Sequence, residues 1–173
     1  MPYLISFDPG VYTGLAIGRY DVDTPYEFER AHQTSGGAEG LPTDNIINLW
    51  AVLQYDEPVE VVSEKFTPRN LAGMSHTQES VEPLRVEGVL VALFEDIHWQ
   101  EPSAQNLVTG KTPAETKKLS DDFLRYHGLY QEPSTIEGRQ KNDANSAIKH
   151  ALAYLKGIGH KPTIDKYWRN YNG

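Results

Sequence analysis

Three acidic residues, Asp8, Glu64 and Asp143, occur where a strand is expected to end or a helix to begin. Asp8 directly follows the apolar run YLISF, and Glu64 directly follows VEVVS. Asp143 is the first residue of the segment DANSAIKHALAYLK. Carboxylates that lie close together repel one another and raise each other's pKa, so proteins that group three of them normally do so to hold a cation. Oxygen ligands of this kind suit Mg²⁺, with Mn²⁺ as a substitute. The three residues form a candidate metal site.

Each of the three acids also has an ordinary structural explanation. Asp8 precedes a Pro-Gly pair and can start a turn, Glu64 can be a solvated strand end, and Asp143 can favour a helix dipole. Their joint placement changes the balance, because sites in open α/β sheets gather beyond the carboxyl ends of strands. The metal-site interpretation is therefore preferred for the set.

The strands that would position these acids can be read from short apolar runs. The runs at 3–7 and 13–19 flank a Pro-Gly turn and predict a β-hairpin. Weak alternation at 26–33 predicts a third, antiparallel strand. The run at 59–63 predicts a buried strand, parallel to the first, that ends at the second acid. A short last strand is expected within 99–104.

The helices follow from apolar residues at helical spacing. This spacing predicts helices at 46–53, 79–97, 121–127 and 142–156, of which the last has the strongest pattern. The segment 35–40 is expected to be a loop. The order β-β-β-α-β-α-β-α describes an α/β protein: a mixed five-stranded sheet, three antiparallel strands and then two parallel strands, flanked by helices.

Composition bounds the class of protein. The chain has 173 residues, 39% of them hydrophobic, which favours one domain with one core. It has no Cys, which excludes disulfides, thiolate metal sites and cysteine nucleophiles and favours a reducing compartment such as the cytoplasm. The first residues, MPYLISFD, lack a basic region and predict no signal peptide. The longest apolar stretch, 86–94, is far shorter than the roughly 20 residues of a membrane span, so no membrane partner is expected.

The net charge of −8 conceals an asymmetry between the two halves of the chain. Residues 1–99 hold 5 basic and 16 acidic side chains, whereas residues 100–173 hold 11 basic and 8 acidic ones. A polyanion is therefore a candidate partner for the second half.

Four segments carry a family resemblance. They are ISFDPGVYTGLAIG, VVSEKF, WQEPSA and KNDANSAIKHALAYL, and they occur in this order between residues 3 and 155. Together they resemble the RuvC-like Holliday junction resolvases of the RNase H-like superfamily, and phage-encoded members most of all. The resemblance implies a RuvC-like nuclease domain at 1–156, followed by a basic, aromatic C-terminal tail at 157–173.

The resemblance also implies an activity. Its members have an RNase H-like fold, and their acids hold two Mg²⁺ ions, about 3.5–4 Å apart, that promote phosphodiester hydrolysis. By this resemblance Asp8 would bridge the ions, Glu64 would bind one of them, and Asp143 would be the third ligand. The expected protein is a homodimeric endodeoxyribonuclease that resolves Holliday junctions, with flaps and forks as other candidate substrates, in the cytoplasm (the host cell's, for a phage protein). The helix holding residues 84–94 would be the dimer surface.

The last helix departs from the family pattern. Three residues after Asp143, where the family usually has Asp, this chain has Ser146, whose hydroxyl is a poor substitute for an anionic ligand. Three explanations remain open: an engineered inactivating change, a natural variant in which Asp143 and His150 suffice, or a junction-binding protein that has lost cleavage. His150 lies seven residues after Asp143 on the same helix face, and packing or phosphate contact is preferred over metal ligation for it.

Contacts to DNA would come from basic side chains near the same edge, because Lys and Arg neutralise phosphates. The candidates are Lys65, Arg69, Lys111, Lys117, Lys118, Arg125, Arg139, Lys141 and Lys149. Singly, each is better explained as solvated surface; as a set they are credible. The aromatic residues Tyr126, Tyr130, Tyr167 and Trp168 would either stack on unpaired bases or cover the core.

Two other functions compete with the nuclease. Ser146 favours a catalytically impaired protein that binds junctions without cutting them. The segment with Asp8, Pro9 and Gly10 also resembles the phosphate-binding hairpin of actin-like or sugar-kinase-like ATPases, but these need two such domains, and 173 residues are too few.

Overall fold

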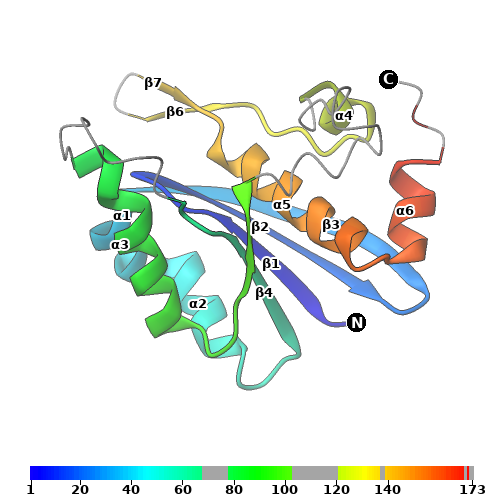
Figure 1. Cartoon of the computed structure of the whole chain (residues 1–173), viewed down its shortest axis with the longest axis horizontal. Coiled ribbons are helices and arrows are strands. Elements are labelled where there is room, and N and C mark those ends of the chain that lie inside the picture. The colour runs from blue at the N-terminus through cyan, green and yellow to red at the C-terminus, as the bar shows by residue number, and fades with distance from the viewer. Residues whose placement is uncertain (68–77, 103–120, 137–138, 170, 172–173) are drawn as a thin grey trace.

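The structure is a computed structural model that describes residues 1–67, 78–102, 121–136, 139–169 and 171. A five-stranded mixed sheet in the order β3-β2-β1-β4-β5 forms its centre (Figure 1). Strand β2 pairs antiparallel with β1 and with β3, whereas β4 pairs parallel with β1, and β5 pairs parallel with β4. The strands are β1 (Tyr3–Asp8), β2 (Tyr12–Asp21), β3 (Thr24–Ser35), β4 (Val59–Glu64) and β5 (His98–Gln100). The predicted fold class is thus confirmed.

Helices cover both faces of the sheet (Figure 1). One face carries α1 (Gly37–Gly40), the 3-10 turn η1 (Leu41–Thr43), α2 (Asn45–Leu53) and α3 (Gln78–Leu93). The other carries α4 (Asp121–Tyr126), α5 (Asp143–Gly157) and α6 (Lys161–Tyr167). A separate two-stranded ribbon, β6 (Ser134–Ile136) and β7 (Arg139–Lys141), precedes α5. None of the helices in the described residues combines the length and the apolar character needed to cross a membrane.

Strand β1 shows how alternation builds two cores. Successive side chains of a strand point to opposite faces. Ile5 and Phe7 are fully buried among the residues of α1, α2 and α3, whereas Leu4 is fully buried among those of α5. Ser6 also faces α5, and its hydroxyl donates a 2.6 Å hydrogen bond to the Ala147 carbonyl. Asp8 lies two residues after Ser6 in the same strand, so its side chain is also on the α5 face.

Two expectations about boundaries were wrong. Helix α3 ends at Leu93 instead of continuing to residue 97, because the Gln54 side chain occupies its end: Nε2 donates to the Leu93 carbonyl at 2.7 Å, and Oε1 accepts from the Glu95 N–H at 3.1 Å. The segment expected to be a loop at 35–40 contains α1. There Glu82, almost fully buried, accepts the Ala38 N–H at 2.7 Å.

The C-terminal segment contains α6, which the sequence analysis did not anticipate. This helix packs on β3 through three side chains that bond the backbone of Tyr26, one of which, Lys166, donates to the Tyr26 carbonyl at 3.0 Å. Thr163 accepts the Tyr26 N–H at 2.8 Å, and the Tyr167 hydroxyl donates to the Tyr26 carbonyl at 2.9 Å. Tyr167 is only 3% exposed and belongs to the α5 core, so of the two roles open to this ring it takes core packing.

Candidate metal centre

Asp8 and Glu64 are brought together by strand pairing. They end β1 and β4, which run parallel and side by side, with Phe7 opposite Ser63. Asp8 and Glu64 each come one residue after this pair, so they are level with each other across the two strands. Residues that are level in neighbouring parallel strands point to the same face of the sheet. That face is the one covered by α5.

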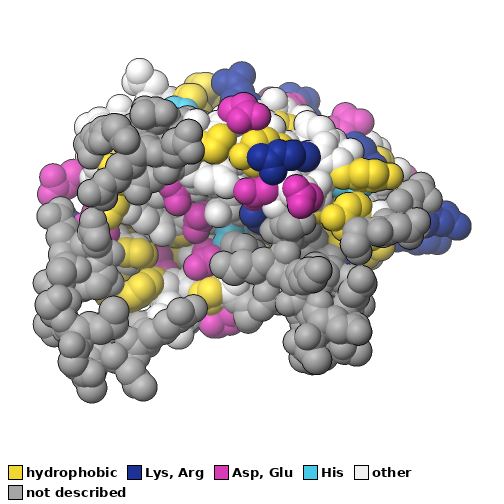
Figure 2. Space-filling view, turned by 90° about the horizontal axis from the view of Figure 1, so that it is seen from above, with side chains coloured by type: hydrophobic (Ala, Val, Ile, Leu, Met, Phe, Trp, Pro, Cys, Tyr) yellow, Lys and Arg dark blue, Asp and Glu magenta, His cyan; other side chains and the backbone are white. Residues whose placement is uncertain are grey.

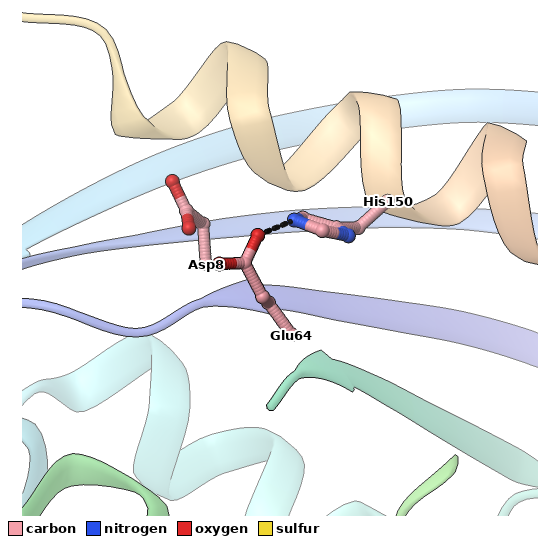
Figure 3. A group of neighbouring side chains, drawn as sticks. All are labelled: Asp8, Glu64 and His150. Carbon is pink, nitrogen blue, oxygen red and sulfur yellow. Dashed lines mark hydrogen bonds and ion pairs between the residues drawn. The ribbon is translucent and has the colours of Figure 1, made fainter. Parts of the chain in front are cut away.

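Helix α5 contributes the third side chain of the centre, His150. Its ring is fully buried, and Nε2 lies 2.7 Å from Oε2 of Glu64. On the other side of the ring, Nδ1 lies 3.0 Å from Oε1 of Gln100, on the neighbouring strand β5. Figure 3 shows the carboxylate of Glu64 between Asp8 and the His150 ring.

These three residues have the arrangement of a metal site. One ligand atom from each of Asp8, Glu64 and His150 lies within 4.8 Å of the other two. Donors about 2.0–2.2 Å from a shared cation fall within such a spread. Two carboxylate oxygens and one imidazole nitrogen therefore fit a divalent cation.

The electrostatics of Asp8 point the same way. Its pKa is raised to about 7, first by burial and further by the charges of Glu64 and Asp143, while His150 and a hydrogen bond from Ser146 act in the opposite direction. A carboxylate held beside other carboxylates is poorly stabilised without a cation. The site is therefore short of positive charge.

Asp143 lies in the first turn of α5, where the helix backbone packs very close to strand β2. A Cβ on Gly14 would lie 1.9 Å from the Asp143 carbonyl oxygen, so only glycine allows the helix to start here. Gln33, opposite Gly14 on β3, accepts the Asp143 N–H through Oε1 at 3.1 Å. This distant side chain caps the helix, since Asn142, the preceding residue, makes no side-chain cap.

The structure thus redistributes the predicted ligands. The acids Asp8 and Glu64 are brought together as expected, and Asp143 is near enough for its charge to raise the pKa of Asp8. The close three-residue group, however, contains His150, for which packing or phosphate contact was preferred. Ser146, at the usual Asp position, hydrogen-bonds to Asp8.

The candidate DNA contacts divide into four sets. Lys65 is exposed directly after Glu64, and Arg125 is 51% exposed, with its guanidinium 3.7 Å from the centre of the Tyr130 ring. Lys149 is only 13% exposed and pairs with Asp121 at 2.7 Å. Arg139 and Lys141 form the ends of β7. The remaining four, Arg69, Lys111, Lys117 and Lys118, lie outside the described residues.

The face that carries α4 and the β6–β7 ribbon has mixed charge. Basic and acidic side chains are interspersed over it, with apolar ones between them (Figure 2). Tyr126, at the end of α4, is 63% exposed and contacts the rings of His127 and Tyr171 edge-on. Tyr126 is therefore accessible for stacking, unlike Tyr167.

Sequence reasoning missed Gln33 and Gln100. Both are neutral side chains in strands, which pattern analysis treats as ordinary surface. Gln100 had one available signal: in a parallel neighbour of β4 that starts near residue 98, its side chain falls on the same face as Glu64. Gln33 could be found only from the register of β2 and β3.

Known proteins show the same architecture. No protein-family model matches the chain, and no curated protein matches its sequence. Solved structures do match its fold, among them T. thermophilus RuvC in complex with Holliday junction substrate (TM-score 0.55, 14% identity) and the Thermus thermophilus RuvC structure (TM-score 0.53, 17% identity). In each comparison the match covers 91% of this chain and 97% of the other. The chain therefore has an α/β fold of the RNase H-like class, and within that class its fold is RuvC-like.

Proposed function

We propose that this protein is a metal-dependent endonuclease that cuts branched DNA, with the four-way Holliday junction as its main substrate. The observation that carries the proposal is the group of Asp8, Glu64 and His150 at the carboxyl ends of two parallel strands in a RuvC-like fold. A solved structure with that fold is RuvC in complex with Holliday junction substrate.

The residues present fit a divalent cation, and Mg²⁺ or Mn²⁺, two ions per site, is proposed. Asp8, Glu64 and His150 would hold one, and Asp8 with Asp143 offers oxygen ligands for another. Bound ions supply the charge that stabilises the attacking and leaving oxygens of a phosphodiester and lower the pKa of water.

The protein's own residues prepare this site. Strand pairing holds Asp8 and Glu64 in a fixed relation, and Gln33 and Gly14 seat the first turn of α5 against the sheet. Ser146 donates a hydrogen bond that orients the Asp8 carboxylate. Because these groups lie on strands and a helix, little reorganisation is needed when substrate binds.

DNA would reach the site past Lys65, the exposed cation next to Glu64 in the chain. Arg125, stacked on Tyr130, and the β7 residues Arg139 and Lys141 are further proposed phosphate contacts. Such contacts make affinity fall as salt concentration rises. The pairing of Lys149 with Asp121 favours a role for Lys149 in holding α4 against α5.

A homodimer is proposed, because a four-way junction presents two symmetry-related strands and a two-fold dimer offers two matching sites. Helix α3 supports this proposal: Leu84 is 55% and Val91 61% exposed, and Gly88 lies between them on the same side with open space where a Cβ would be. Sedimentation of the chain bound to junction DNA tests it. A strict monomer would exclude paired cutting by one complex.

One observation favours a second function. Ser146 provides a hydroxyl where an anionic ligand is usual in the resembled family, and a site with fewer anions binds cations less strongly. A catalytically impaired protein that binds junction DNA is therefore the alternative. It predicts junction affinity that does not depend on Mg²⁺ and no nicking in Mn²⁺.

The test is nicking of a labelled four-way junction and of a linear duplex with matched sequence, in Mg²⁺ and then in Mn²⁺. The original chain is compared with Ser146→Asp, and Asp8→Asn serves as the control for contaminating nuclease. We expect the original chain to cut the junction and not the duplex.

Each outcome has a clear meaning. Cutting by the original chain that disappears in Asp8→Asn excludes the binding-only alternative. Cutting by Ser146→Asp alone means that the site is complete except for one anion. Binding without cutting by either chain overturns the nuclease proposal, and binding to neither DNA overturns both functions.

A further inference from the structure

Gln100 makes a contact that a surface strand residue would not need. Its strand β5 pairs with β4, so that Gln100 lies opposite Glu64, and its carbonyl accepts the Lys65 N–H at 2.7 Å. The backbone of Gln100 is therefore anchored beside the metal centre. From this position its side-chain oxygen reaches Nδ1 of His150 at 3.0 Å.

This contact requires a hydrogen on Nδ1 of His150. An amide oxygen only accepts hydrogen bonds, so Nδ1 is the donor and is protonated. Nε2 faces the Glu64 carboxylate at 2.7 Å, and this oxygen also only accepts, so without metal the contact holds a hydrogen that a bound cation would replace, which leaves Nε2 as the ion-binding nitrogen. Proteins commonly orient metal-ligating histidines in this way, by giving the other ring nitrogen a fixed acceptor.

We infer that Gln100 is a positioning residue that fixes His150 as a metal ligand, and that the resulting site prefers Mn²⁺ and other first-row transition ions to Mg²⁺. The inference rests on the proposed metal-dependent function and refines the nature of its ion. It assigns His150 to the inner ligands, beyond the packing or phosphate contact expected from its spacing.

The preference follows from the donor atoms. Imidazole nitrogen suits transition ions, whereas Mg²⁺ favours oxygen ligands and retains several waters. In α5 the sequence offers a serine at position 146 and a histidine at position 150, so this helix brings an imidazole instead of a second carboxylate close to Asp8. A fully buried ring also leaves little room for the waters of Mg²⁺ on that side.

The test measures metal binding by the full chain without DNA. Affinities for Mn²⁺, Zn²⁺ and Mg²⁺ are determined by calorimetry, and imidazole ¹⁵N spectra report the protonated nitrogen of each histidine. Signals of His150 are identified by their loss in His150→Gln. We expect a hydrogen on Nδ1 both without metal and with it, and loss of the hydrogen at Nε2 when Zn²⁺ binds.

Three variants isolate the contribution of Gln100. Gln100→Leu removes the acceptor and is expected to weaken Mn²⁺ binding about 10–100-fold, with a much smaller change for Mg²⁺. Gln100→Glu keeps an acceptor and is expected to retain the Mn²⁺ affinity. Gln54→Leu is the matched control, because Gln54 also bonds through its side chain but does so at the end of α3. It is expected to bind both ions like the original chain.

The inference fails if Nδ1 of His150 carries no hydrogen, if Zn²⁺ leaves the His150 signals unchanged, or if Gln100→Leu binds Mn²⁺ normally. These readouts are separate from the proposed function. A chain that binds Mn²⁺ through His150 but cuts no junction keeps the inference and overturns the nuclease. A chain that cuts the junction although metal leaves the His150 signals unchanged keeps the proposed nuclease and overturns the inference.

Discussion

Strand β4 presents two glutamates to helix α5, four residues apart, and their surroundings are opposite. At the amino end, Glu60 accepts hydrogen bonds from the hydroxyls of Tyr20 and Tyr154, and His98 lies 3.2 Å away. At the carboxyl end, Glu64 contacts the His150 ring, and its charge together with that of Asp143 acts on the nearby Asp8. One strand and one helix thus build both a satisfied carboxylate and a crowded one.

The difference separates a structural acid from a functional one. Around Glu60, burial raises the pKa of both tyrosines and the bond to the carboxylate raises it further, so they remain neutral donors. Around Glu64, the neighbours include an acid, Asp8, as well as His150, and burial together with the charges of Glu64 and Asp143 raises the pKa of Asp8 to about 7. Hydrogen-bond donors complete the first group, whereas the second still needs a cation.

The largest expected effect comes from removing a charge from the crowded end. Asp8→Asn should reduce junction nicking at least ~100-fold, or about 3 kcal/mol in activation free energy, because it removes a proposed ligand while keeping side-chain size. The rate is measured by single-turnover nicking. Unchanged nicking would remove Asp8 from the site.

The same end should make the metal-free protein sensitive to pH. A carboxyl whose folded pKa lies above its ordinary value binds extra protons in the folded state, so the free energy of unfolding falls as pH rises from about 4 to about 7. One pKa unit corresponds to about 1.4 kcal/mol, so a rise from 3.8 to about 7 changes the free energy of unfolding by about 4 kcal/mol. Urea unfolding in EDTA measures it. Asp8→Asn should flatten the profile, and an equally steep profile in this variant would assign the effect to another group.

Breaking the satisfied end should affect stability and not chemistry. Glu60→Ala leaves two tyrosine hydroxyls without their acceptor and should lower the free energy of unfolding by about 2–3 kcal/mol. Glu60→Gln keeps an oxygen acceptor and should cost less. Both should retain nicking at a temperature where they are folded. Loss of nicking by a folded Glu60→Gln would mean that the two ends are coupled.

Asp44 is a third carboxylate for the comparison, and it is surrounded by hydrogen-bond donors. Burial alone would raise the pKa of Asp44, but hydrogen bonds from His32 and from the backbone of Ile47 and Ile46 outweigh it, and the pKa is lowered. The stabilisation is present above the ordinary pKa and is lost as pH falls through the folded value. Asp44→Ala should cost about 1 kcal/mol, since it also removes the N-cap of α2.

Asp44→Asn, which keeps the capping oxygen without the charge, is the control. Its stability should be close to that of the original chain and should vary less with acid pH. Thermal unfolding between about pH 3 and pH 7 measures both variants. If Asp44→Asn lost as much stability in acid as the original chain, the acid dependence would not come from Asp44.

Much of the fold was predictable because its signals are local. The short apolar runs of β1 and β4 indicated two strands, and the turn between the first two strands indicated a hairpin; both are confirmed. The periodicity of 142–156 likewise predicted α5. The end of α3 was not predictable, because the side chain that ends it, Gln54, comes from another helix.

The candidate site divides in the same way. By itself the sequence determined that Asp8 and Glu64 end two strands, since a short apolar run that stops at an acid is a local pattern. Only the tertiary structure decided that Gln33 caps α5 and that Gln100 and Glu64 hold His150 between them. These contacts join residues 50 to 110 positions apart, and they depend on the strand register and on the depth at which α5 packs against Gly14, which no local pattern records.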